Sequence, residues 1–162
     1  MTNNKNDFGG SGITLELFDW ITSNIQEGKT ILELGAGFVS TKFLSERYKL
    51  YSVEDKAQYL NKFNSTYIYA PIDTENNWYY RKALEEDLPK DYDCILVDGP
   101  TGEGNRWGFL HNLDLFRQDV PIVVDDTWRD AEKDMLLKIV EKTGKKYELF
   151  QNFGVIHTLN VL

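Results

Sequence analysis

The stretch T-I-L-E-L-G-A-G-F-V-S-T-K-F-L, from Thr30 to Leu44, decides the fold of this chain. It begins as an apolar run that contains Glu33, passes through Gly35 and Gly37, and continues with apolar residues at helical spacing. This order predicts a buried strand, a tight turn and a helix. At such a turn the main chain, rather than side chains, faces the space above the strand, which suits a nucleotide-like ligand.

The residues of this turn have separate expected roles. Glycine lacks Cβ, so Gly35 and Gly37 can take positive φ and let a ligand lie against the main chain. Ser40 and Thr41 have the short polar side chains that cap helices, and we expect them to cap the helix that follows the turn.

Outside this stretch, strand patterns alternate with helix patterns. A first helix should start at the N-cap Thr14, and the end of the chain should form a hairpin, since only 152–154 separate its two strand-like runs. The alternation predicts an α/β fold with a mostly parallel, doubly wound sheet and helices on both faces. The predicted strands are 31–34, 49–54, 66–70, 93–97, 121–125, 147–151 and 155–162, and the later helices are 40–48, 56–63, 79–86, 107–117 and 130–143.

Length and charge limit the classes of protein to consider. With 162 residues and 41% hydrophobic content, we expect one domain over 1–162, with residues 1–10 flexible. A net charge of −8 argues against binding to nucleic acid or to a membrane surface. Cys94, the single cysteine, is expected to be a core thiol. Without a membrane-length apolar run or a signal-peptide core, we expect a cytoplasmic protein.

Acidic residues close most of the predicted strands. They are Glu33, Glu54 with Asp55, Asp98, and Asp125 with Asp126, whereas the third strand leads through Pro71 to Asp73. The carboxyl ends of parallel strands share one sheet edge, and ligands bind in the crevice there. A single acid at a strand end is usually a helix cap or a solvated loop residue, but this number of acids predicts a site.

The acid of the second strand has a specific candidate role. Glu54 lies 17 residues beyond Gly37, near the roughly 20-residue offset at which an acid binds a ribose hydroxyl pair in dinucleotide-binding units. Asp55 is the competing residue, although it is better placed as the N-cap of helix 56–63. The alternative for Glu54 is a local pair with Lys56.

The glycine pattern separates two kinds of ligand. A nicotinamide cofactor would ask for G-x-G-x-x-G, whereas this chain has Ser40 at the third glycine position and Glu33 before the turn. An acid there would repel a pyrophosphate but suits a cationic ligand. The E-x-G-x-G form of Glu33, Gly35 and Gly37 resembles the first motif of class I S-adenosylmethionine-dependent methyltransferases.

The resemblance covers about residues 11 to 162, and the segments L-E-L-G-A-G-F-V-S-T, Y-S-V-E, I-L-V-D-G-P-T-G and V-V-D-D-T-W-R are similar to small xylan and polysaccharide O-methyltransferases. It implies a Rossmann-like seven-stranded sheet with an antiparallel C-terminal strand, S-adenosylmethionine as cofactor, and a small-molecule or carbohydrate acceptor methylated on oxygen. The residues expected to bind the cofactor are Ser11, Thr14, Glu33, Gly35, Ala36, Gly37, Ser40, Thr41, Glu54, Asp55, Pro71, Asp73 and Asp98.

Three residues are expected to face the acceptor. Asp98 is the candidate base, because methyl transfer needs an aligned oxygen nucleophile relieved of its proton. Arg106 could hold the acceptor or pair with a nearby acid, and Asp126 could instead cap helix 130–143 or meet Arg129. The three-glycine loop that carries Arg106 is a candidate lid.

A metal is the alternative use of the same acids. Catechol O-methyltransferase-like enzymes place acids after strands four and five around Mg²⁺, but this chain has Asp-Asp where they have Asp-Asn. We therefore expect no metal; if one is bound, its ligands are Asp98, Asp125 and Asp126. Two other functions compete: a nicotinamide-dependent reductase, and a non-catalytic module that binds the cofactor only.

Overall fold

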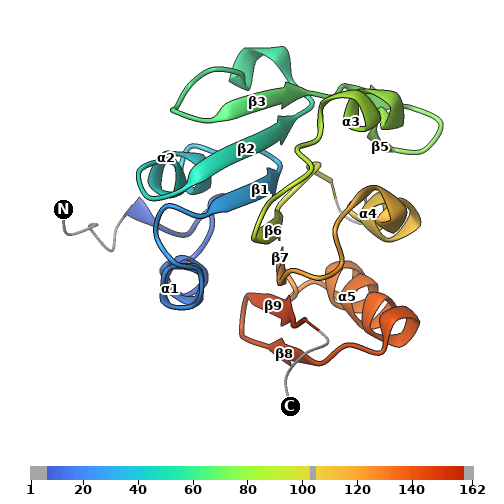
Figure 1. The fold of residues 1–162 in the computed structure, drawn as a ribbon. Coiled ribbons are helices and arrows are strands. Elements are labelled where there is room, and N and C mark those ends of the chain that lie inside the picture. The colour runs from blue at the N-terminus through green and yellow to red at the C-terminus, as the bar shows by residue number, and fades with distance from the viewer. Residues whose placement is uncertain (1–6, 103–104, 159–162) are drawn as a thin grey trace.

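The computed structural model describes residues 7–102 and 105–158, which form a central sheet flanked by helices (Figure 1). The strands of the large sheet are β1 (Thr30–Leu34), β2 (Lys49–Glu54), β3 (Thr66–Tyr69), β6 (Cys94–Val97), β7 (Ile122–Asp125), β8 (Tyr147–Leu149) and β9 (Phe153–Ile156). The helices are α1 (Leu15–Asn24), α2 (Ser40–Ser45), α3 (Arg81–Asp87), α4 (Trp107–His111) and α5 (Asp130–Thr143), with 3₁₀ turns η2 (Ala57–Tyr59) and η3 (Leu113–Leu115).

The strand order confirms the predicted fold class. The seven strands are arranged β3-β2-β1-β6-β7-β9-β8, with parallel pairing from β3 to β7 and antiparallel pairing of β9 with both β7 and β8. The order reverses between β1 and β6, because the chain builds outward from β1 to β3 and then returns to the other side of β1. In open α/β sheets this switch point is where a crevice forms beyond the strand ends.

Two apolar layers cover the sheet. On one face α1 and α2 bury Leu17 and Phe43 against β1 and β6 residues such as Ile31 and Leu96. On the other face α3, α4 and α5 pack over a second cluster that includes Leu84, Phe109, Met135, Leu32 and Val97. Figure 1 shows this separation, with α1 and α2 on one side of the sheet and α3 to α5 on the other.

The main local difference from the sequence prediction lies between β2 and β3. The predicted helix 56–63 is replaced by η2, and Asn61 has a left-handed backbone with φ 59°. A residue at positive φ ends a helical run, and N-K-F-N-S supplies turn-forming asparagines and serine in place of a helix. The connection therefore leaves no helix over this part of the sheet.

Other predicted boundaries shift by less. The helix predicted over 107–117 divides at Asn112 into α4 and η3, and the predicted loop 71–78 contains a small hairpin of β4 (Ile72–Asp73) and β5 (Trp78–Tyr79). The last strand is shorter than 155–162, and its residues 159–162 lie outside the described part of the chain. Of the predicted flexible segment, 1–6 also lie outside, whereas the ring of Phe8 stacks on Phe43 with centroids 4.8 Å apart.

Cys94 is fully buried, as expected of a core thiol, and burial raises its pKa to about 12. Within 7–102 and 105–158, no helix combines the length and apolar character that crossing a bilayer requires.

Candidate functional site

The turn after β1 touches the turn after β6. Gly35 has φ +94°, and a Cβ there would lie 2.7 Å from the carbonyl oxygen of Asp98. A Cβ on Gly99 would in turn lie 2.7 Å from the Cα of Gly35. Only glycine allows this close approach of the two backbones. The positive φ predicted for Gly37 is wrong, since its backbone does not enter that region. The atom nearest to a Cβ there would be Ser40 Oγ, at 3.1 Å.

Beneath the glycine turn, Glu33 is buried and surrounded by hydroxyl groups. Thr41 Oγ1 donates to its carboxylate at 2.8 Å and Ser52 Oγ at 2.7 Å, and Ser40 Oγ also donates to it. Ser40 and Thr41 are therefore not helix caps, which corrects the prediction. The N-cap of α2 is Val39, and no side chain bonds there.

Glu33 reaches the glycine turn through Thr41. The backbone N–H of Gly37 donates to Thr41 Oγ1 at 2.8 Å, so the hydroxyl that donates to the carboxylate also holds the turn. Burial raises the pKa of Glu33 to about 7, against the lowering effect of its hydroxyl partners. Glu33 does not line the cleft described below. It therefore supports the turn from beneath.

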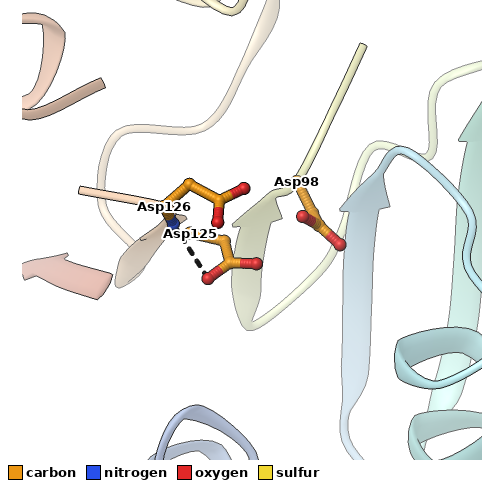
Figure 2. A group of neighbouring side chains, drawn as sticks. All are labelled: Asp98, Asp125 and Asp126. Atoms are coloured by element: carbon orange, nitrogen blue, oxygen red, sulfur yellow. Dashed lines mark hydrogen bonds between the residues drawn. The ribbon is translucent and has the colours of Figure 1, made fainter. Parts of the chain in front are cut away.

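On the other side of the turn, three carboxylates gather beyond the ends of β6 and β7, as Figure 2 shows for Asp98, Asp125 and Asp126. An oxygen of each lies within 4.8 Å of the others. Asp126 has a left-handed backbone with φ 63°, and its N–H donates to Asp125 Oδ1 at 2.9 Å. This conformation directs both neighbouring acids toward Asp98 rather than to opposite faces, as consecutive strand residues would be.

Arg106 lies among these acids, and its side chain is only 5% exposed. Its Nη2 pairs with Asp126 Oδ2 at 2.9 Å and with Asp98 Oδ1 at 3.5 Å, while its Nη1 donates to the carbonyl oxygen of Asp125 at 2.9 Å. Of the two roles open to Arg106 from the sequence, pairing with the nearby acids is thus present in the structure.

Burial and mutual repulsion alter the titration of this acidic cluster. The pKa of Asp98 is raised well above its ordinary value, first by burial and then by the charge of Asp125, although Arg106 opposes the shift. The pKa of Asp125 is raised to about 6, first by burial and then by Asp126. Two of these carboxylates therefore hold a proton more tightly than an exposed aspartate does.

The local alternatives for Asp126 are also resolved. Helix α5 has Arg129 as its N-cap with no side-chain bond, so the alternative in which Asp126 caps this helix is wrong. Asp126 does meet Arg129, at 3.8 Å, and it accepts a hydrogen bond from Trp128 Nε1 at 3.2 Å. Arg129 in turn lies 3.8 Å from Glu132, which is almost fully buried.

The glycine turn and the acidic cluster open into one cleft of about 410 Å³. Seven of the predicted site residues line it: Ser11, Ala36, Gly37, Ser40, Asp98, Arg106 and Asp126. Ten further lining residues were not singled out by the sequence analysis as cofactor or acceptor ligands: Gly12, Phe38, Val39, Tyr59, Lys62, Phe63, Tyr67, Thr101, Gly102 and Arg129. Part of the predicted lid, Glu103 and Gly104, lies outside the described residues.

Glu54 and Asp55 lie at the end of β2, outside the lining of the cleft. Glu54 is buried, and its Oε1 accepts the backbone N–H of Lys56 at 2.9 Å, so the local alternative is present as a backbone contact. Burial raises the pKa of Glu54, which that N–H opposes. Asp55 is not the predicted N-cap, because Lys56 is the N-cap of η2 and no side chain bonds there.

Three other predicted residues have local contacts. Thr14 caps α1 as predicted, with Oγ1 accepting the N–H of Leu17 at 3.3 Å. Asp73 holds its own turn, accepting from the N–H of Glu75 at 3.0 Å, and Pro71 precedes it. Thr14, Pro71 and Asp73 do not line the cleft, nor do Gly35, Thr41 and Asp125.

Tyr79 has a polar atom without a partner close to the glycine contact. Its hydroxyl is buried, forms no hydrogen bond among the described residues, and lies 2.5 Å from the position of a Cβ on Gly99. Burial raises its pKa well above the ordinary value, and Asp55 and Glu54 add to the shift. A buried hydroxyl without a partner is costly, so this oxygen beside the turn has unused hydrogen-bonding capacity, although Tyr79 does not line the cleft.

Comparison with solved structures shows which proteins share this fold. MycE methyltransferase from the mycinamycin biosynthetic pathway, in complex with Mg and SAH, is similar with a TM-score of 0.65 at 13% identity, over 94% of this chain and 51% of that chain. Precorrin-6y C5,15-methyltransferase from Geobacter metallireducens is similar with a TM-score of 0.59 at 18% identity, over 96% and 95%. Aeropyrum pernix fibrillarin with natively bound S-adenosyl-L-methionine has 0.57 at 15%, over 83% and 67%.

These likenesses define the fold: it is that of the S-adenosylmethionine-dependent methyltransferases. The chain spans about half the length of the MycE chain. No protein-family model matches the sequence, and comparison with curated proteins gives no match either. The xylan-related branch inferred from the motifs stays a hypothesis.

Proposed function

We propose that this chain is an S-adenosylmethionine-dependent methyltransferase that methylates an oxygen of a small-molecule or carbohydrate acceptor. The observation that carries the proposal is the glycine turn at the switch point between β1 and β6, held from below by Glu33 and open to a cleft lined by Asp98. Two of the solved structures with this fold, those of MycE and fibrillarin, contain S-adenosylhomocysteine and S-adenosyl-L-methionine, which supports the cofactor.

The residues around the turn suit this cofactor. Gly37 and Ala36 leave main chain in contact with the cleft, and the unpartnered Tyr79 hydroxyl lies beside the same turn. In the proposal, Glu54 accepts the ribose hydroxyls, and Asp55 and the Pro71–Asp73 segment lie toward the adenine. Ser11, Thr14, Ser40 and Asp98 lie toward the methionine end, whose ammonium and sulfonium suit an acidic surrounding.

The bound cofactor would supply an electrophilic methyl group on its sulfonium and would leave as S-adenosylhomocysteine, whose sulfur keeps the electron pair of the broken S–CH₃ bond. Asp98 would accept the proton of the acceptor hydroxyl as that oxygen forms its bond to the methyl group. A raised pKa makes Asp98 a stronger base once ionised, and the nearby Arg106 stabilises the ionised form. Asp126 and Arg106, fixed to each other at 2.9 Å, would orient the acceptor beside Asp98.

We further propose that no metal takes part. A divalent ion at Asp98, Asp125 and Asp126 would compete with Arg106, whose guanidinium already lies 2.9 Å from Asp126 and 3.5 Å from Asp98. One cation among these acids makes a second one less favourable. If the proposal holds, adding Mg²⁺ leaves the midpoint of thermal unfolding unchanged. A rise in this midpoint with Mg²⁺ that disappears in Asp126→Asn and on adding EDTA would contradict it.

Calorimetric titration with S-adenosylhomocysteine tests the main proposal. We expect binding by the wild type and a loss of about 10- to 100-fold in Glu54→Ala, because hydrogen bonds to a charged carboxylate are worth about 1.5–3 kcal/mol. Asp55→Ala separates the two candidate ribose acids, and Asp19→Ala, an exposed acid on α1, is the control. No binding by the wild type, or binding of NADH instead, would overturn the proposal; binding without transfer to any acceptor would leave a cofactor-binding module.

A further inference from the structure

One end of the cleft is aromatic and has no role in the transfer proposed above. Four residues form it, and together we call them the aromatic arm: Phe38, Tyr59, Phe63 and Tyr67. The ring of Phe38 stands nearly perpendicular to those of Tyr59 and Phe63, at 89° and 84°, with centroids 5.9 and 6.1 Å away. Phe38 is 60% exposed although it follows the glycine turn directly.

The irregular β2–β3 connection creates this arm. Tyr67 pairs in register with Ser52, whose hydroxyl bonds Glu33, so Tyr67 lies on the α2 face of the sheet. A helix between β2 and β3 would cover that face, but η2 spans only Ala57–Tyr59. The aromatic side chains therefore border the cleft instead of packing beneath a helix.

Positive charge accompanies the arm in a chain of net charge −8. Lys62 lines the cleft, is exposed, and forms no ion pair with the described residues. Lys56 places its Nζ 5.9 Å from the ring centroid of Tyr59. Of these two lysines only Lys62 lines the cleft, so an anionic group on a ligand held by the arm would meet its ammonium group without displacing an ion-pair partner among the described residues.

We propose that the aromatic arm binds the methyl acceptor and that the acceptor is an aromatic carboxylate. Rings at right angles form a corner in which a flat ring packs by its face on one wall and by its edge on the other, an arrangement that aromatic groups prefer. The carboxylate lies at Lys62, and a ring hydroxyl faces Asp98 across the glycine turn. This inference rests on the proposed function, and it narrows the acceptor from small molecules and carbohydrates to one class.

The arm is assigned to the acceptor rather than to the cofactor because of where Glu54 lies. Under the proposed function Glu54 holds the ribose, and neither Glu54 nor Asp55 lines the compartment that contains the arm. The nucleoside would therefore extend from the glycine turn toward the end of β2, where Glu54 lies, and the arm stays free.

Calorimetry with 3,4-dihydroxybenzoate on protein saturated with S-adenosylhomocysteine tests the inference. We expect binding, at least tenfold weaker binding of catechol, which lacks the carboxylate, and no binding of methyl glucoside. Tyr59→Ala and Lys62→Met should each weaken dihydroxybenzoate at least tenfold and leave the affinity for S-adenosylhomocysteine unchanged. The controls are Tyr80→Ala, a tyrosine elsewhere on the surface that is more exposed than Tyr59, and Lys49→Met, whose Nζ lies 5.6 Å from the ring centroid of Tyr51.

Each other result has a defined meaning. If S-adenosylhomocysteine binds but dihydroxybenzoate does not, or if methyl glucoside binds as well, the inference fails and the proposed function stands. If Tyr59→Ala or Lys62→Met weakens S-adenosylhomocysteine itself, the arm belongs to the cofactor and the inference fails. If S-adenosylhomocysteine does not bind, the proposed function fails, and dihydroxybenzoate binding to the cofactor-free protein then decides whether the arm takes aromatic acids.

Discussion

The acids on the two sides of the glycine turn are stabilised by different means. Glu33 is surrounded by hydroxyl groups, lies outside the cleft, and acts on the turn through Thr41. Asp98 and Asp126 share the guanidinium of Arg106 and border the cleft. Hydroxyls stabilise either protonation state of an acid, whereas a fixed positive charge favours ionised carboxylates. The first arrangement is suited to support, and the second to binding and proton transfer.

Replacing the guanidinium should have the largest effect. Arg106→Met removes the buried cation from three acids, of which Asp125 is buried and Asp98 and Asp126 are partly buried, and we expect a loss of about 3–5 kcal/mol in the free energy of unfolding. Urea denaturation at pH 7 measures it, and the double variant Arg106→Met, Asp126→Asn should recover part of the loss. Arg81→Ala, which breaks an exposed pair with Asp114, is the control. A loss no greater than that of the control would show that the acids do not depend on Arg106.

On the Glu33 side of the turn, the prediction concerns how the free energy of unfolding changes with pH. Its pKa rises from 4.5 to about 7 on folding, so the folded state binds the proton more tightly than the unfolded state. Stability should therefore fall as pH rises through that window, by up to roughly 3 kcal/mol from this group. Glu33→Gln cannot ionise, yet its amide can both donate and accept. We measure the free energy of unfolding of both proteins in urea. From pH 5 to pH 8, Glu33→Gln should become increasingly more stable than the wild type.

The hydrogen bonds of the hydroxyl groups around Glu33 also favour its protonated form. Ser52 Oγ contacts Glu33 and Ser65 Oγ, each at 2.7 Å, and Ser65 Oγ donates to the carbonyl oxygen of Leu50. These three contacts need three protons, and the two hydroxyls hold only two. Protonated Glu33 supplies the third by donating to Ser52 Oγ, so that Ser52 Oγ donates to Ser65 Oγ; this reverses the direction in which Ser52 donates to an ionised Glu33. If wild type and Glu33→Gln instead change in parallel with pH, Glu33 is ionised throughout and this account is wrong.

Local pattern was sufficient to predict the sheet and the location of the crevice. Alternating strands and helices, and acids such as Asp98 at strand ends, depend on neighbours in sequence, so β6 and β7 bring Asp98 and Asp125 together as expected. The roles of Ser40 and Thr41 were mistaken because their partner Glu33 competes with the helix end for the same hydroxyls. A helix cap stabilises by only about 1 kcal/mol, which is less than the free-energy cost of leaving a buried carboxyl group without hydrogen bonds.

Contacts between segments that lie far apart in the sequence could not be predicted from such local patterns. Ser52 lies 19 residues from Glu33, and nothing local marks it as a partner. Tyr59, Phe63 and Tyr67 follow one another at intervals of four, which is typical of a buried helix face, and so the helix over 56–63 concealed the aromatic arm. The signal that could have revealed the arm is Phe38, a large aromatic residue directly after a glycine turn.

The smallest effect is expected at Thr41, whose hydroxyl connects the carboxyl of Glu33 to the backbone of the glycine turn. Thr41→Val keeps the branched shape but removes the hydroxyl, so the N–H of Gly37 and one oxygen of Glu33 each lose a partner. We expect a loss of about 1–3 kcal/mol in the free energy of unfolding, measured in urea at pH 6. Thr41→Ser restores the hydroxyl and should stay close to wild type.

Cofactor affinity separates a support role from a purely structural one in the same pair of variants. If Thr41 holds the turn in its binding conformation, Thr41→Val should also weaken S-adenosylhomocysteine, and Thr41→Ser should not. Equal affinity in both variants, with stability lost only in Thr41→Val, would mean that the turn keeps its shape without Thr41. In that case Glu33 would contribute to the core beneath the site but not to the arrangement of Gly37 within it.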